Sequence, residues 1–78
     1  MPEDWRERIV IDPKIMAGKP VIRGSRVPVD AIVRRIAEGM GIRDVLEDYP
    51  NLSEEDVKAA LRYAASILEG EEITPVTG

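Results

Sequence analysis

Three cations lie among glycines and prolines in residues 17–28, and theirs is the most distinctive chemistry in the sequence. They are Lys19, Arg23 and Arg26. A guanidinium donates paired hydrogen bonds to a phosphate or a carboxylate, so this basic ribbon predicts a surface that binds nucleic acid or an acidic partner. A second interpretation stays open, in which these cations pair with Asp or Glu of the same chain and only fix the loop.

The glycines and prolines of the ribbon are expected to shape its backbone, because glycine adopts left-handed angles and proline fixes φ. These loop-shaping residues are Gly18, Pro20, Gly24 and Pro28. The ribbon is not a phosphate-binding P-loop, since Gly18-Lys19 precedes a proline rather than a Ser or Thr that opens a helix.

Two further arginines extend the set of candidate binding residues. Arg34 and Arg35 fall between Val33 and Ile36 in a helical pattern, which places both on the polar face of a helix. A solvated helix face is the simpler interpretation, and an extension of the basic surface is the alternative. The candidates for binding nucleic acid or a partner are Lys19, Arg23, Arg26, Arg34 and Arg35.

The residue types that the chain lacks exclude most enzyme chemistry. Its 78 residues include no His and no Cys. The chain therefore cannot build a Ser-His-Asp triad, a thiol nucleophile or a thiolate metal site, and it lacks the usual general base near neutral pH. Asp44, Glu47 and Asp48 could gather Mg²⁺, but a solvated helix face explains them better. We expect a non-enzymatic protein with no catalytic residue, metal site or cofactor.

The net charge of −4 is the sum of two halves of opposite sign. Residues 1–35 hold eight Lys and Arg against five Asp and Glu, a balance of +3, and residues 36–78 hold three against ten, a balance of −7. A uniformly negative chain would argue against nucleic acid. The basic half makes nucleic-acid binding possible again and places it in the N-terminal ribbon.

Residue periodicity predicts a mostly α fold with a short β segment. The β-branched runs at 9–11 and 21–22 indicate two short strands within a strand and loop segment at 8–28. Apolar residues at helical spacing predict three helices over 29–70, joined by tight turns as in a helix-turn-helix-like bundle. We expect a single small domain at 1–70 and a flexible acidic tail at 71–78.

The charge at the start of the last predicted helix argues against the usual mode of DNA reading. In a helix-turn-helix, the second helix of the pair enters the major groove with its N-terminus first. Here that N-terminus follows the predicted cap Ser53 and carries Glu54, Glu55 and Asp56. These acids would face phosphates. If the protein binds DNA, the N-terminal arginines are the better candidates.

The small size of the chain predicts self-association. Two short strands are marginal alone, and a domain this small has a limited core. We expect a homodimer formed through the N-terminal strands. We see no signal peptide and no apolar run long enough to cross a bilayer, so we expect a cytoplasmic protein without membrane contact.

Several stretches give the chain a family resemblance. They are Ile11-Asp12-Pro13, Gly18-Lys19-Pro20-Val21-Ile22-Arg23-Gly24-Ser25-Arg26-Val27-Pro28-Val29, Ala37-Glu38-Gly39, Tyr49-Pro50-Asn51-Leu52 and residues 55–64. On these residues the chain resembles the small prokaryotic family called domain of unknown function 433, described as antitoxin-like. Two positions depart mildly from that family, with Ala17 where Gly is frequent and Ser25 where Thr is frequent.

The resemblance implies a homeodomain-like helical unit behind a short β segment, often dimeric. It also implies gene pairing with PIN-like ribonuclease toxins, which the small partner would neutralise, and it carries over no catalytic residue. The leading hypothesis is an antitoxin-like binding module that also binds its own promoter DNA. The alternatives are a DNA-binding regulator without a toxin, and a structural subunit whose strands complete a sheet with another chain.

Overall fold

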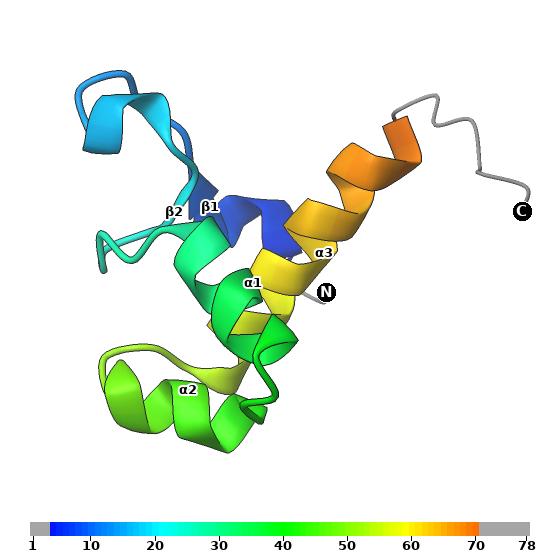
Figure 1. Cartoon of the computed structure of the whole chain (residues 1–78). Helices are drawn as coiled ribbons and strands as arrows, with labels where there is room; N and C mark the ends of the chain where they lie inside the picture. The colour runs from blue at the N-terminus through cyan, green and yellow to red at the C-terminus, as the bar shows by residue number, and fades with distance from the viewer. Residues whose placement is uncertain (1–3, 71–78) are drawn as a thin grey trace, which may run out of the picture.

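The computed structural model describes residues 4–70 and confirms a mostly α fold with a short N-terminal β segment (Figure 1). The predicted tail at 71–78 lies outside the described residues. In chain order the elements are η1 (Trp5–Arg8), β1 (Ile9–Val10), η2 (Met16–Gly18), β2 (Val21–Ile22), α1 (Val29–Ala37), α2 (Ile42–Asp48) and α3 (Glu54–Gly70).

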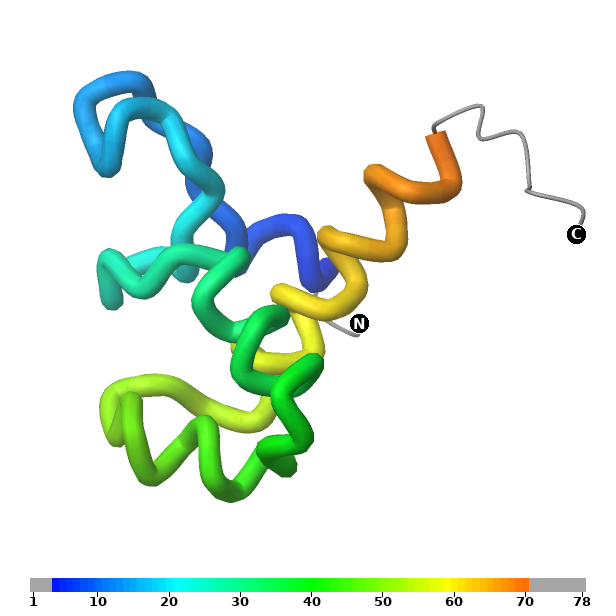
Figure 2. Tube along the Cα trace, viewed as in Figure 1, coloured from blue at the N-terminus to red at the C-terminus, as the bar shows by residue number. Residues whose placement is uncertain are grey.

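Helix α1 lies between the strands and α2, and α3 packs beside it. The two strands lie at one end of α1 and α2 lies at the other, while α3 runs beside α1 and then away from the rest of the molecule (Figure 1). The loop between the strands rises as an arch away from the helices, and η2 forms its far side (Figure 2). The N-terminal ribbon and the acidic helices therefore occupy different parts of the molecule.

The two strands pair in antiparallel register, with Ile9 opposite Ile22 and Val10 opposite Val21. The next pair in this register would be Ile11 with Pro20, but β1 ends at Val10, one residue earlier than the β-branched run predicted.

A second short pairing, which the sequence did not predict, puts β2 in the middle of the β segment. The N–H of Ile22 donates to the carbonyl of Val27 at 2.9 Å, and the N–H of Val29 donates to the carbonyl of Pro20 at 2.9 Å. Residues 23–26 therefore form a tight turn that is held at both of its ends.

The core is aliphatic. Its largest fully buried side chains are Ile22 from β2, Ile32 from α1, Val45 from α2 and Val57 from α3. One strand and all three helices thus contribute a large apolar group to the same cluster. Burial of these groups fixes the strands against the helix bundle and holds the 23–26 turn at its edge.

The start of α3 is tied both to its own cap and to the N-terminal segment. The hydroxyl of Ser53 accepts the N–H of Asp56 at 3.3 Å, and the Asp56 carboxylate accepts the N–H of Ser53 at 2.9 Å. The predicted cap Ser53 is confirmed, and with Asp56 it forms a capping box. Arg8 also donates to Asp56 at 2.8 Å and links the residues before β1 to this helix end.

Candidate functional site

The 23–26 turn presents two arginines on a rigid backbone. Gly24 has φ of 79° and Arg26 has φ of 59°, so both residues lie in the left-handed region that the reversal requires. The hydroxyl of Ser25 donates to the carbonyl of Ile22 at 2.8 Å and accepts the N–H of Val27 at 3.0 Å. These two bonds brace the turn from inside, while Arg23 and Arg26 remain exposed.

Both guanidiniums border a hollow of about 190 Å³, which we call the arginine pocket. The side chains of Arg23 and Arg26 form no hydrogen bond or ion pair with any other residue in the range 4–70. The pocket is lined by Val10, Ile15, Val21, Ile22, Arg23, Gly24 and Arg26. It therefore combines an aliphatic floor with two cations that have no counter-ion within the described residues.

The loop after β1 forms the opposite wall of the arginine pocket and is itself hydrogen-bonded. The Asp12 carboxylate accepts the N–H of Lys14 at 2.9 Å, and the Asp12 carbonyl accepts the N–H of Ile15 at 2.8 Å. The next three residues, 16–18, all have positive φ, including the 85° of Gly18. This left-handed turn reverses the chain and carries Ile15 over the pocket.

The other cations predicted to bind do not line the arginine pocket. Lys19 lies 3.5 Å from Asp30, in an exposed ion pair that matches the internal-pairing interpretation. The Arg35 Nε donates to Asp48 at 3.2 Å, and its guanidinium lies 4.8 Å from the centre of the Tyr49 ring, so Arg35 joins α1 to α2.

Arg34 is exposed, and its side chain has no hydrogen-bond or ion-pair partner within the described part of the chain. Of the five candidates, only Arg23 and Arg26 are brought together.

The first turn of α3 is acidic and internally satisfied. Partial burial by itself raises the pKa of Asp56, but the N–H and hydroxyl of Ser53 and the guanidinium of Arg8 outweigh it and lower that pKa. Glu54 and Glu55 both lie within reach of Lys58, at 3.4 Å and 3.8 Å. The charge of this helix end remains unsuited to phosphate.

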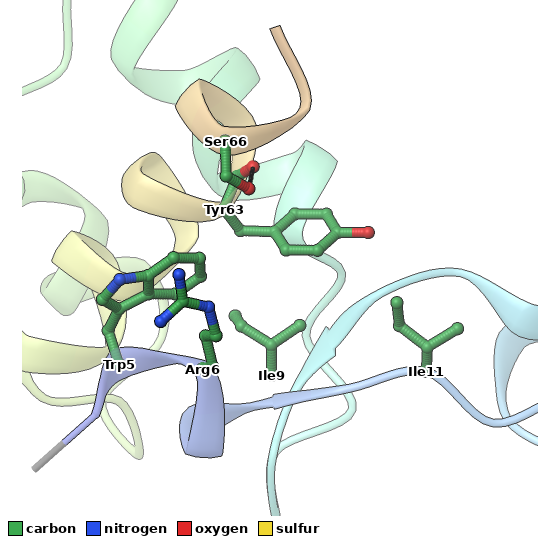
Figure 3. Close-up of a pocket in the computed structure, with 6 residues that line it drawn as sticks. All are labelled: Trp5, Arg6, Ile9, Ile11, Tyr63 and Ser66. Atoms are coloured by element: carbon green, nitrogen blue, oxygen red, sulfur yellow. Dashed lines mark hydrogen bonds between the residues drawn. The ribbon is translucent and has the colours of Figure 1, made fainter. Parts of the chain in front are cut away.

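A second hollow, the aromatic pocket, has a volume of about 240 Å³ and is lined by Trp5, Arg6, Ile9, Ile11, Tyr63 and Ser66. Figure 3 shows the Trp5 indole and the Tyr63 ring on either side of Ile9. The Arg6 guanidinium lies 4.9 Å from the centre of the indole and pairs with Asp4 at 3.3 Å. The sequence did not place Trp5, and its only signal was that Trp5 and Tyr63 are two of three aromatic residues.

The described residues also bear on metal binding and on membrane crossing. Within residues 4–70, no group of three or more Asp or Glu side chains is arranged to hold a metal ion. No helix in that range is long and apolar enough to cross a membrane.

Comparison with known proteins places the chain among proteins without an assigned activity. Residues 9–64 match the family model described as "Protein of unknown function (DUF433)". The crystal structure of a DUF433 member from Anabaena variabilis is similar with a TM-score of 0.74 and 34% identity, covering 80% of this chain and 61% of that one.

Two relatives known from sequence share parts of the chain. The uncharacterized protein y4eO of Sinorhizobium fredii is 39% identical over 59 residues, which is 76% of this chain and 27% of that protein. An uncharacterized protein of Archaeoglobus fulgidus is 68% identical over 28 residues, which is 36% of this chain and 78% of that one. The chain thus spans only about a quarter of the length of y4eO.

Proposed function

We propose a function from the premise that this chain belongs to the DUF433 family, namely that it is a non-enzymatic, antitoxin-like module that neutralises a PIN-like ribonuclease. One observation carries this proposal. Arg23 and Arg26 lie on a braced turn beside an aliphatic pocket and have no ion-pair partner among residues 4–70, which is the arrangement expected of a group that binds carboxylates of another protein.

The proposed mechanism is occlusion. A metal-dependent nuclease holds its ions with a cluster of carboxylates, and that cluster attracts cations when the metal or substrate is displaced. Because the backbone of the turn is already hydrogen-bonded, binding costs little backbone entropy, and the main ordering cost is the rotamer freedom of the two arginine side chains. The lack of His and Cys in the chain is in keeping with a role by binding rather than by catalysis.

The direct test uses the product of the adjacent gene. Tagged protein should retain that product in a pull-down, and co-expression should relieve the growth arrest that the product causes alone. If no complex forms and the growth arrest persists, the antitoxin proposal is wrong.

A second candidate is DNA binding, either as autoregulation or as a regulator without a toxin. The observation that favours it is the basic charge of the N-terminal half, in which Arg23, Arg26 and Arg34 are all exposed. The acidic start of α3 argues against groove reading by that helix. DNA affinity should then fall steeply with salt, because phosphate contacts release counterions. Unchanged affinity in Arg23→Ala/Arg26→Ala would remove this surface from consideration.

We also propose that the working unit is a homodimer joined through β1. Ile22 uses its N–H toward Val27, so Ile9, its partner in the register, turns its carbonyl toward the open edge of the sheet. The N–H of Ile11 has no hydrogen-bond partner in the part of the chain described, and its side chain is 56% exposed. A second copy of β1 would satisfy these groups. The alternative of a structural subunit would use the same edge with a different chain.

A further inference from the structure

We infer that the arginine pocket binds an aliphatic side chain from a polypeptide segment that carries carboxylates on both sides of that side chain. The inference rests on the proposed function and deepens it, because it names the chemistry of the partner segment rather than only its charge. Three features of the pocket support it: its floor, its rim and its walls.

The floor of the arginine pocket is suited to an apolar group. Val10, Val21 and Ile15 all line the pocket, and the half-buried Val10 and Ile15 offer the accessible apolar surface over the buried Val21. The volume of about 190 Å³ accommodates one side chain rather than a large ring system. Removing such an aliphatic group from water strengthens binding by roughly tenfold or more.

The rim of the pocket requires anions. Arg23 and Arg26 border it from the same turn, and neither side chain has an internal partner among residues 4–70. Two carboxylates next to the inserted aliphatic group would therefore supply one counter-ion for each guanidinium. This arrangement selects an acidic segment and rejects a basic one by like-charge repulsion.

The same lining favours polypeptide over nucleic acid. Single-stranded nucleic acid is held by stacking its bases on aromatic rings, and none of the residues that line the arginine pocket is aromatic. Nucleic acid also carries no branched aliphatic group to fill the floor. We therefore assign the pocket to an acidic polypeptide segment.

The walls of the pocket are already ordered. Ser25 braces the turn through two hydrogen bonds, and the loop bearing Ile15 is fixed by bonds to Asp12. Binding should consequently proceed without a large change in the backbone.

The experiment titrates ¹⁵N-labelled protein with three short blocked peptides that differ only at the centre or the flanks. They are Glu-Leu-Glu, Glu-Ser-Glu and Gln-Leu-Gln, each within the same neutral flanking residues. Glu-Leu-Glu should shift the backbone amides of Val10, Ile15 and Gly24 in a saturable way. Each of the other two peptides should bind at least tenfold more weakly.

Variants make the assignment specific. Arg23→Gln/Arg26→Gln should abolish the shifts produced by Glu-Leu-Glu. Arg62→Gln should leave them unchanged, because Arg62 is an exposed arginine on α3 that does not line the pocket. If Glu-Ser-Glu bound as tightly as Glu-Leu-Glu, the pocket would not select an aliphatic side chain. If the double variant bound Glu-Leu-Glu as tightly as wild type does, the two arginines would not bind the carboxylates. If single-stranded DNA bound more tightly than Glu-Leu-Glu and shifted the same amides, the assignment of the pocket to a polypeptide would be wrong.

The outcome is separable from the proposed function, since relief of growth arrest is measured independently. If no peptide binds but the double variant loses neutralisation, the acidic-peptide assignment fails and the antitoxin role stands. If the peptide binds in the predicted manner while the adjacent gene product is not neutralised, the pocket assignment stands and the antitoxin role fails.

Discussion

Ala17 holds a backbone conformation that its side chain disfavours. Its φ is 57°, within a run of three left-handed residues that turns the loop above the arginine pocket. The left-handed region costs an L-residue with a Cβ about 1–2 kcal/mol.

We predict that Ala17→Gly stabilises the protein by about 0.5–1 kcal/mol, because relief of the left-handed strain exceeds the added flexibility of the unfolded chain. Urea unfolding measures the change. The matched control is Ala65→Gly in the exposed face of α3, which should lower the free energy of unfolding by about 1 kcal/mol. Equal destabilisation by both substitutions would show that residue 17 is not strained.

For single residues, the sequence predicted which cations could bind a partner, but not which of them pair with acids of the same chain. It identified Lys19, Arg23 and Arg26 as one ribbon and left open whether they pair internally. The structure pairs Lys19 with Asp30 and leaves Arg23 and Arg26 without such a partner among the described residues. That distinction depends on the turn at 23–26, whose closure comes from the Val27 and Val29 hydrogen bonds between segments. Local periodicity carries no information about those bonds.

At the scale of elements, the first turn of α3 joins a helix cap to an ion pair. Asp56 accepts hydrogen bonds from Ser53 and Arg8, and its carboxylate side chain is only 15% exposed. The pKa of Asp56 is lowered despite the opposing effect of partial burial, so the folded state prefers the charged form. The stability that this preference supplies is fully present above the unfolded pKa and is lost as pH falls through the folded pKa.

Asp56→Asn should therefore lower the free energy of unfolding at pH 7 by about 1–2 kcal/mol, through loss of cap and ion pair. The difference between wild type and variant should shrink as the pH falls below about 4. Chemical unfolding at pH 7, 4 and 3 measures this convergence. Glu47→Gln, an exposed carboxylate on α2, is the control and should leave stability nearly unchanged. A pH-independent difference for Asp56→Asn would contradict the account.

The helices were more predictable than the β segment for a physical reason. Apolar residues at helical spacing bury one face of each helix, and the starts of α1, α2 and α3 follow from that pattern. The strands are only two residues long, so their register depends on the core position of Ile22 rather than on a long alternating pattern. The apolar stripe of α3 was also predicted, but only its first half is covered, and Leu68 remains 59% exposed.

In the whole molecule, the basic ribbon at residues 17–28 lies apart from the acidic helices, although Arg8 and Arg35 of the basic half pair with Asp56 and Asp48 of the acidic half. The basic ribbon lies at the strand end of α1, and the acidic α2 and start of α3 lie toward its other end (Figure 1). The open edge of β1 adjoins the aromatic pocket, because Ile9 and Ile11 both line that pocket (Figure 3). Dimerisation there would leave the arginine pocket accessible, since Val10 lines it from the opposite face of the strand.

We predict that sedimentation equilibrium at micromolar concentration gives twice the chain mass of 8.7 kDa. Ile11→Asp should yield the single-chain mass, because a charge at this edge opposes strand pairing. Met16→Asp, which alters another exposed apolar residue on the loop, should keep the dimer. A monomeric wild-type protein, or a dimer that survives Ile11→Asp, would remove β1 as the interface.

The proposed neutralisation of a partner protein depends on two arginines of one braced turn that have no ion-pair partner among residues 4–70. Growth of cells tests this dependence when they express the adjacent gene product together with wild-type protein, Arg23→Gln/Arg26→Gln or Arg62→Gln. We expect growth with wild type and with Arg62→Gln, and arrest with the double variant at equal expression and unchanged thermal stability. Full rescue by Arg23→Gln/Arg26→Gln would contradict it.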